Sequence, residues 1–496
     1  MKHNVKQLFV LGNTKLKQVL SLALEPANEI RLIHFYSVKL LAVIYLIAFV
    51  SLLTQVNGLF SPQGILPIAN VTAMLNQQGI GWFEWPHLFF AASSEFLVSL
   101  LLIGCVASVC LLFGIVPLLS TIICWVIYLS FVNCGSVFMS FQWDILLLEV
   151  SFLFCWAMPI TLLWKSTDAF SPPRIVVWAM WVCCFRLMIT SGWVKIASKD
   201  QWWRQLRALD IHYWTQPLPH KLSWYVHQLP SWFDKGCVAL ILCIECVAPC
   251  LIWTTKKLRC WVGLLFISLM VAVMLTGNYC FFNLLTIVLA LYLFQDSVFR
   301  TTIKTCQSNH SLNKLRAIIA TSLIVIGLSV DLARFLPANS VVGTAYYVMR
   351  YIQPFRLINQ YGLFASMTTT RNEIEIWASM DQKNWQPYQF KYKPNNAQDP
   401  PRFTWFHQPR LDWQMWFVAL RGYSQQSWVN RLALALFNQS TAVERLFESV
   451  PFNTAPNYVV FTQSGYTFST FKQRSHSDNW WVKQPTQAFS PVLQKP

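Results

Sequence analysis

Charged residues are scarce in this sequence. They make up 12% of its 496 residues, whereas soluble globular domains carry about a quarter. Hydrophobic residues account for 55% of the chain, and 24 of them are tryptophans. A composition this poor in charge excludes an ordinary soluble protein, so we interpret the chain as a membrane protein.

Acidic residues are the scarcer of the charged kinds, with 21 Asp and Glu against 38 Lys and Arg. A basic surplus can indicate a nucleic-acid partner, but the sequence has no Lys/Arg-rich run, no zinc-ligand pattern and no known nucleic-acid-binding motif. The basic residues gather instead in short loops between apolar spans, which is how membrane orientation is encoded. We therefore expect membrane lipid, and no nucleic acid, among the partners.

Cysteine is absent after Cys306, and the 14 cysteines between Cys105 and Cys306 lie mostly within apolar spans. A disulfide framework is thus not expected, because free cysteines are readily buried as small hydrophobic residues. No CxxC pair has the second pair or the histidines of a zinc site. Phosphate-binding loops, nucleophile elbows and haem motifs are also missing. We expect no metal and no cofactor.

Residues 1–32 are polar and basic and lack the short apolar core of a cleavable signal peptide. We expect this segment to be cytoplasmic and the first transmembrane helix to act as the export signal.

Apolar stretches long enough to cross about 30 Å of hydrocarbon recur along the first two thirds of the chain. We predict nine spans, near residues 34–54, 95–115, 117–133, 144–163, 175–191, 237–254, 259–276, 280–297 and 317–335. With the N-terminus inside, the loops that contain Lys165, Lys256 and Arg300 all become cytoplasmic, as the positive-inside rule requires. The sequence thus predicts a polytopic α-helical membrane protein.

The transmembrane domain is predicted at residues 33–340. Its segment at 192–236 is long, polar and aromatic, and it should lie outside, structured against the membrane. A linker is expected at 341–361.

After the linker the long apolar stretches give way to alternating polar and apolar patterns. Residues 373–377 and 388–392 alternate between polar and apolar around a turn at Asp381, which predicts a β-hairpin. Helical patterns follow at 412–422, 426–438 and 441–449, and an alternating stretch at 458–471 predicts further strands. We expect a C-terminal extramembrane α+β domain at 362–484 and a tail at 485–496.

The stretch FTWFHQPRLDWQMWFVAL, residues 403–420, combines charged and aromatic residues at high density. Its large apolar side chains recur at helical spacing, which favours a helix in a domain core. The alternative is a recognition surface, because Trp and Arg dominate interface hot spots. The candidates for recognising a client, or for locking the domain onto the membrane part, are His407, Gln408, Arg410, Asp412, Trp413 and Trp416.

Several polar residues fall within the predicted spans or in the short turn between two of them, namely Glu95, Asp144, Glu149, Glu245, Asn278 and Asn283. Carboxylates at membrane depth need a partner, a cavity or water. Asp144 and Glu149 are five residues apart and so point about 140° away from each other on a helix, which argues against a catalytic pair. Asp144 suits a helix N-terminus. Arg186 is a candidate partner for Glu95 or Glu245, and the asparagines can tie helices together.

Lys195, His212 and Asp144 are the candidate catalytic residues. A lysine among aromatic residues can act as a base when desolvation lowers its pKa, but such lysines also pair with carboxylates or reach for the interface. His212 fits either a structural hydrogen bond or a helper role.

Several segments together resemble the lipase maturation factor family, in the right order and over most of the chain. They are FQWDILLLE at 141–149, SGWVKIAS at 191–198, WRQLRALDIHYWTQPLP at 203–219, LTGNYCFFNLLTI at 275–287, FKYKPNNAQDPPRF at 390–403, HQPRLDWQMWF at 407–417 and VPFNTAPNYVV at 450–460. The membrane half is also distantly similar to the membrane domain of the vitamin K-dependent carboxylase type.

The resemblance implies a multi-span membrane protein that helps secreted lipases to fold and assemble, in animals in the endoplasmic reticulum, with the C-terminal domain facing the lumen and engaging the client. Trp214 stands where the family more often has an acidic residue, which argues against a carboxylate site there. The short loops and the lack of a retention tetrapeptide favour a bacterial inner membrane over an endoplasmic reticulum membrane. The C-terminal domain is then periplasmic, or lumenal in a eukaryote.

Two functions follow from these observations. The first is a non-enzymatic maturation factor whose partner is an exported client protein such as a lipase. The alternative is an integral-membrane enzyme of the carboxylase-like superfamily that acts on a lipid-phase or exported substrate, with Lys195 as base. A transporter is less favoured, since no inverted repeat is visible.

Overall fold

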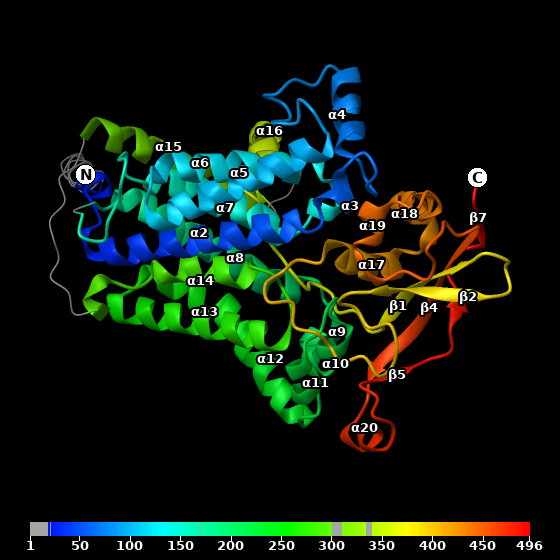
Figure 1. Cartoon of the computed structure of the whole chain (residues 1–496). Helices are drawn as coiled ribbons and strands as arrows, with labels where there is room; N and C mark the ends of the chain where they lie inside the picture. The colour runs from blue at the N-terminus through cyan, green and yellow to red at the C-terminus, as the bar shows by residue number, and fades with distance from the viewer. Residues whose placement is uncertain (1–17, 20, 169, 300–309, 334–339) are drawn as a thin grey trace.

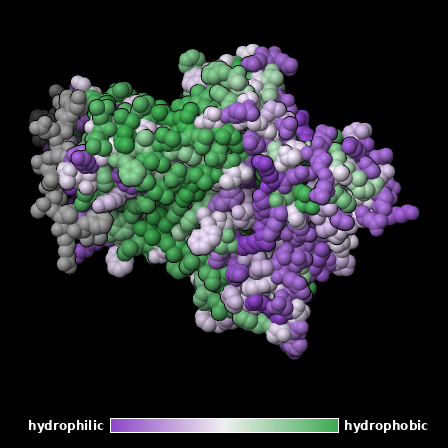
Figure 2. All heavy atoms as spheres, in the orientation of Figure 1, coloured by the Kyte–Doolittle hydropathy of each residue, from purple (hydrophilic) through white to green (hydrophobic). Residues whose placement is uncertain are grey.

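The computed structural model describes residues 18–496 except 20, 169, 300–309 and 334–339. A bundle of long helices lies beside a C-terminal domain of strands and helices (Figure 1). Hydrophobic residues cover the side of the bundle, whereas hydrophilic residues predominate over the C-terminal domain (Figure 2). The basic residues predicted to be cytoplasmic before residue 18, and those at 300 and 304, lie outside the described residues.

Within the described ranges, seven helices are long and apolar enough to cross a membrane. They are α2 (Arg31–Leu53), α5 (Ser94–Phe113), α6 (Pro117–Cys134), α8 (Arg174–Ala197), α12 (Ser231–Cys246, extended by η3, Ala248–Trp253), α13 (Lys256–Thr276) and α15 (His310–Ala333). The predicted helical membrane class is confirmed, with seven candidate spans where nine were expected.

The other two expected spans are shorter helices, α7 (Gln142–Ala157) and α14 (Phe282–Leu291). At 1.5 Å per residue they reach about 24 Å and about 15 Å, less than the hydrocarbon thickness. They pack against each other inside the bundle, and each also contacts α8. Non-helical backbone at membrane depth is tolerated when protein surrounds it, so these buried helices can be short while the lipid-facing helices cannot.

Short helices connect the spans and cap the bundle. They are η1 (Asn28–Ile30), α3 (Val56–Phe60), α4 (Ile68–Gln77), η2 (Ser136–Met139), α9 (Gln201–Arg204), α10 (Ala208–Thr215), α11 (Lys221–His227), η4 (Asp296–Phe299), α16 (Ser340–Ile352) and η5 (Gln353–Phe355). The predicted linker at 341–361 is therefore largely helical. The thirteen described cysteines are all free.

The C-terminal domain is built on an antiparallel sheet, which confirms the predicted mixed α and β class. Its strands are β1 (Asn372–Ser379), β2 (Trp385–Phe390), β3 (Phe447–Ser449), β4 (Tyr458–Phe468), β5 (Trp481–Lys483), β6 (Gln487–Ala488) and β7 (Leu493–Gln494). The order is β3-β2-β1-β4-β5, and β6 and β7 also pair with β4. Its helices are α17 (Arg410–Arg421), η6 (Tyr423–Gln425), α18 (Ser427–Phe437), α19 (Thr441–Glu444) and α20 (Phe471–Ser477).

The predicted hairpin is present. Ile376 of β1 lies opposite Tyr388 of β2 and Phe461 of β4. The turn between β1 and β2 is held by Asp381, whose carboxylate accepts hydrogen bonds from the backbone N–H groups of Lys383 at 2.9 Å and Asn384 at 2.8 Å. These two bonds, with the one from Asn384 Nδ2, hold the pKa of Asp381 well below its usual value.

Two details of the C-terminal prediction are wrong. The pattern at 441–449 gives a helix only up to Glu444, and Phe447–Ser449 is a strand that extends the sheet beside β2. The expected tail at 485–496 contributes β6 and β7. Both errors arise because strand pairing partners lie far away in the chain and override local helical or polar patterns.

The segment at 192–236 packs on the C-terminal domain. Trp203 and Trp224 belong to a buried cluster with Trp480 and Trp481 from the end of the chain. The indole N–H of Trp224 donates to the Ser469 hydroxyl at 3.3 Å. A second, larger cluster of buried hydrophobic residues runs without a break from the bundle into the C-terminal domain.

Candidate functional site

Arg410 and Asp144 form an ion pair at the junction between the C-terminal domain and the bundle. Nη1 and Nη2 of Arg410 each donate to one carboxylate oxygen of Asp144 at 2.9 Å. The hydroxyl of Tyr128 also donates to Asp144, and the backbone carbonyl of Phe138 accepts from Arg410. A two-pronged pair of this kind is the strongest geometry for arginine and carboxylate.

Helix starts position both partners. Asp144 lies in the first turn of α7, where the helix dipole favours a carboxylate. Arg410 is the first residue of α17, directly after Pro409. The side chains are 0% and 1% exposed. Asp144 therefore has the two roles weighed from the sequence, at a helix N-terminus and as a partner of a cation.

The residues before α17 bind α2. The Ser51 hydroxyl contacts His407 Nδ1 at 2.9 Å and accepts from the backbone N–H of Gln408, also at 2.9 Å. The Gln55 amide donates to the Gln408 carbonyl at 2.7 Å and accepts from the Arg410 backbone N–H at 2.8 Å. Burial lowers the pKa of His407 to about 4, and the charges of Arg410 and Lys391 add to the effect.

Asp412, Trp413 and Trp416 also face inward. The carboxylate of Asp412 accepts from the backbone N–H groups of Tyr392 and Lys393 at 2.9 and 3.0 Å, and burial raises its pKa. The ring of Trp413 lies 4.8 Å from that of Trp143 in α7. The indole N–H of Trp416 donates to the Thr215 carbonyl at 2.8 Å. All six recognition candidates thus contact the membrane part or the interior of their own domain.

Glu149 and Arg186 form a second buried network. Arg186 donates to Glu149 at 2.9 Å and to Asp331 of α15 at 2.6 Å. Glu149 also accepts from the backbone N–H of Asn359 and the hydroxyl of Tyr361, each at 2.7 Å. The network fixes the chain where it enters the C-terminal domain. Arg186 was expected to pair with Glu95 or Glu245, and this expectation is wrong.

Lys195 and Glu245 are partners of each other. Their Nζ and Oε2 atoms lie 2.6 Å apart, and Lys195 also donates to the Ser191 carbonyl at 3.0 Å. Glu95 has a different setting, since it lies exposed in the first turn of α5. Two of the three catalytic candidates are therefore not brought together. Lys195 is paired with Glu245, whereas Asp144 is paired with Arg410.

His212 begins a short chain of hydrogen bonds. Its Nε2 lies 3.0 Å from the Tyr279 hydroxyl, which donates to Gln216 Oε1 at 2.8 Å. Gln216 in turn donates to the Thr276 carbonyl at 2.8 Å. Burial lowers the pKa of His212 to about 4, and the charge of Lys195 adds to the effect. The chain joins α10 to the non-helical segment between α13 and α14.

Asn278 also lies in that non-helical segment. It donates to the carbonyls of Leu218 at 3.1 Å and Arg402 at 2.9 Å, and it accepts from the Thr404 backbone N–H at 3.0 Å. Its hydrogen bonds therefore connect loops, whereas the sequence predicted that it connects helices. Asn283 is buried within α14.

The structure contains a further charged cluster, around Glu373, that the sequence did not lead us to predict. Its carboxylate is paired with Arg371 and, at 3.1 Å, with Lys393. Arg371 also donates to the Pro217 carbonyl at 3.0 Å. Glu373 and Glu375 are only 4% and 6% exposed, although they alternate with isoleucine along β1. The sequence signal that could have predicted this cluster is the basic residue Arg371 directly before a strand that carries two glutamates.

The buried polar clusters of the junction enclose very little cavity volume. The cavities beside Tyr279 and beside Glu149 each have a volume of about 10 Å³, roughly enough for one water. No group of three metal-ligating side chains occurs among the described residues. The polar residues at the junction are therefore arranged to hold the two parts of the protein together.

Comparison with known proteins gives one family for both halves of the chain. The profile of the lipase maturation factor transmembrane domain matches residues 33–301, and that of the lipase maturation factor C-terminal domain matches residues 357–491.

Relatives match over nearly the whole chain. Lipase maturation factor 2 of Homo sapiens is 30% identical, over 91% of this chain and 81% of its own. Lipase maturation factor 1 of Mus musculus is 27% identical, over 95% of this chain and 90% of its own. Lipase maturation factor 2 of Gallus gallus is 29% identical, over 91% and 80%. No solved structure gives a significant match.

Proposed function

The chain belongs to the lipase maturation factor family, and from this membership we propose that it is a membrane-embedded factor that assists the folding or assembly of an exported client protein. By analogy with the names of its relatives, the client is a lipase. The protein acts in this proposal as a binding platform, and its C-terminal domain lies on the periplasmic or lumenal side. A bacterial inner membrane remains the proposed location, with the endoplasmic reticulum membrane in a eukaryote.

The proposal draws support from the way the C-terminal domain is fixed to the bundle. The contacts of His407, Gln408 and Arg410 with α2 and α7 hold the domain in one orientation. A domain held in this way presents a constant surface, which reduces the entropy lost when a client binds. We assign these residues to locking the domain, the second of the two roles considered from the sequence.

The client contact is better assigned to Trp405. Within the aromatic stretch 403–420 its side chain is 77% exposed, whereas Trp413 is 4% exposed. Trp405 and Phe406 also have φ angles of 51° and 65°, in a region that bulky residues rarely adopt. Such strain of about 1–3 kcal/mol per residue occurs most often at functional sites. This exposed, strained tryptophan is the observation that carries the binding proposal.

Photocrosslinking in the full-length protein tests this assignment. A photoreactive amino acid at position 405, in cells that export a lipase, is expected to capture that lipase. The matched control is the same substitution at Phe471, which is 57% exposed on α20 of the same domain. Capture from position 471 but not from 405, or no protein adduct at all from 405, overturns the proposed contact.

The enzyme alternative has less support from the geometry. Lys195 and His212 lie in one buried region, since Lys195 is near enough to lower the pKa of His212. Lys195 is held by Glu245, however, and the adjacent cavity beside Tyr279 has a volume of only about 10 Å³. A lysine whose amine is held by a carboxylate is poorly placed to act as a base, and substrates need far more room than this cavity offers.

A further inference from the structure

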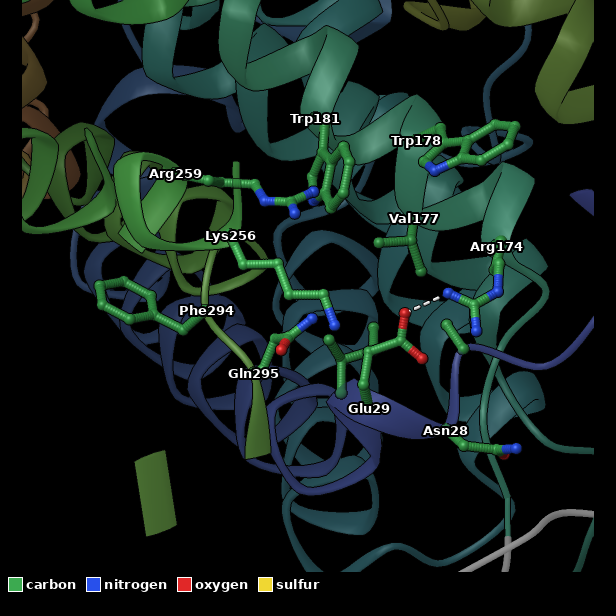
Figure 3. A pocket seen from close by; sticks show the side chains of 12 residues that line it. Asn28, Glu29, Arg174, Val177, Trp178, Trp181, Lys256, Arg259, Phe294 and Gln295 are labelled. Atoms are coloured by element: carbon green, nitrogen blue, oxygen red, sulfur yellow. Dashed lines mark hydrogen bonds and ion pairs between the residues drawn. The ribbon is translucent and has the colours of Figure 1, made fainter. Parts of the chain in front are cut away.

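A cavity lies at the end of the bundle away from the C-terminal domain. Its volume is about 490 Å³. It is bounded by the first turns of α8 and α13, by η1 and by the chain that follows α14 (Figure 3). None of the junction clusters contributes to it, so it needs an explanation separate from the proposed function.

Cations dominate the polar lining of this cavity. Arg174, Lys256 and Arg259 face one carboxylate, Glu29, so three positive charges against one negative charge leave two positive charges. Arg174 is ion-paired with Glu29. No described carboxylate forms an ion pair with Lys256 or Arg259. The cavity is thus built with uncompensated positive charge.

The other wall is aromatic. Trp178 and Trp181 are three residues apart on α8 and so lie on one face of it. The guanidinium of Arg259 lies 4.1 Å from the ring centre of Trp181, and Figure 3 shows it beside that ring while the Lys256 amine is directed towards Glu29. Tryptophan is enriched at the level of lipid headgroups. The cavity therefore offers cations for an anion and an apolar wall for what is attached to it.

We propose that this cavity binds the phosphate group of an anionic phospholipid. Lys256 and Arg259 are its phosphate ligands, and Trp178 and Trp181 lie against the glycerol and the first acyl carbons. Basic pockets between transmembrane helices bind anionic headgroups, and the N-terminal ends of α8 and α13 add their positive dipole ends. Inorganic phosphate shares the headgroup chemistry but lacks the part that the tryptophans would cover.

Lipid titration of the purified full-length protein in neutral detergent, followed by native mass spectrometry, tests the proposal. Phosphatidylglycerol is expected to bind with a Kd at least about tenfold lower than that of phosphatidylcholine. In the Lys256→Gln/Arg259→Gln variant the Kd for phosphatidylglycerol should rise at least about tenfold, since each basic residue contributes appreciably to anionic lipid binding. The control is Lys257→Gln, an exposed neighbour outside the cavity lining, and it should keep the Kd within about threefold.

Each other outcome overturns the proposal. Equal binding of both lipids removes anion selectivity, and unchanged phosphatidylglycerol binding in the double variant places the lipid elsewhere. Inorganic phosphate that displaces phosphatidylglycerol completely at millimolar concentration identifies a soluble ligand. If the double variant does not fold, the single Lys256→Gln variant, whose side chain is exposed at the start of α13, should raise the Kd about fivefold.

Discussion

Arg410 of α17 and Asp144 of α7 are separated by 266 positions in the chain, and each is the counter-ion of the other where the C-terminal domain meets the membrane bundle. The contact is two-pronged, with both N to O distances at 2.9 Å. Neither side chain is more than 1% exposed. The stability of the C-terminal domain is therefore coupled to that of the bundle.

Breaking this pair on one side should destabilise the protein strongly. We expect Arg410→Met to lower the free energy of unfolding by about 3–5 kcal/mol, because Asp144 is left buried without its counter-ion. The double variant Arg410→Met/Asp144→Leu should lose less than Arg410→Met alone, since no uncompensated charge remains. Denaturant unfolding in detergent, followed by tryptophan fluorescence, measures the difference.

The control for that series is the exposed pair of Arg402 and Glu448, whose side chains are 39% and 46% exposed. Arg402→Gln should change the free energy of unfolding by less than about 1 kcal/mol. An Arg410→Met variant as stable as Arg402→Gln contradicts the structural role of the buried pair.

Acid should weaken the junction through His407. Its pKa is about 4 in the folded protein, against about 6.5 in an unfolded chain. Between these values the unfolded state binds more protons, so stability falls as the pH decreases from about 6.5 to about 4, by up to about 1.4 kcal/mol per pH unit. Above about 6.5 the histidine is neutral in both states and contributes no pH dependence.

His407→Gln should reduce that pH dependence, measured as the change in melting temperature between pH 7 and pH 4.5. His476→Gln, which alters an exposed histidine on α20, should leave it unchanged. Part of the dependence should persist in the His407 variant, because His212 is buried with a pKa of about 4 as well. An unchanged slope in His407→Gln disproves the assignment.

Lys195 distinguishes the maturation factor from the enzyme. Lys195→Met alone should cost about 3–5 kcal/mol of stability, because Glu245 stays buried without a partner. The double variant Lys195→Met/Glu245→Gln should recover most of that loss and should mature the client as well as the wild type, per amount of folded protein. Loss of client maturation in a fully folded double variant favours catalysis by Lys195.

The two ends of the bundle should lie on opposite sides of the membrane. We expect a peptide tag inserted after Ser166, in the loop with Lys165, to be protected from protease in intact spheroplasts, because basic loops stay inside. A tag after Pro496 should be cleaved, since the proposed orientation places the C-terminal domain outside. Cleavage of both tags, or protection of both, contradicts the proposed orientation.

Much of the fold could be predicted from hydropathy and from local sequence patterns. Lipid-facing helices such as α5 and α13 could be predicted because a helix in lipid must satisfy all of its backbone hydrogen bonds internally and must present apolar side chains to the lipid tails. The hairpin of β1 and β2 could be predicted because its partners are adjacent and a local turn at Asp381 joins them. The shortness of α7 and α14 could not, because burial inside the bundle releases a helix from the thickness of the bilayer.

The sequence by itself determined that this is a helical membrane protein with a cysteine-free C-terminal α and β domain, and its motifs indicated the family. Tertiary structure decided which charges meet. Asp144 with Arg410, Glu149 with Arg186, and Lys195 with Glu245 are pairs whose members lie on different helices. No periodicity encodes such pairs, since they depend on how helices pack. Residues 407–413, HQPRLDW, accordingly face inward and lock the two parts of the molecule together, while Trp405, just before them, is largely exposed.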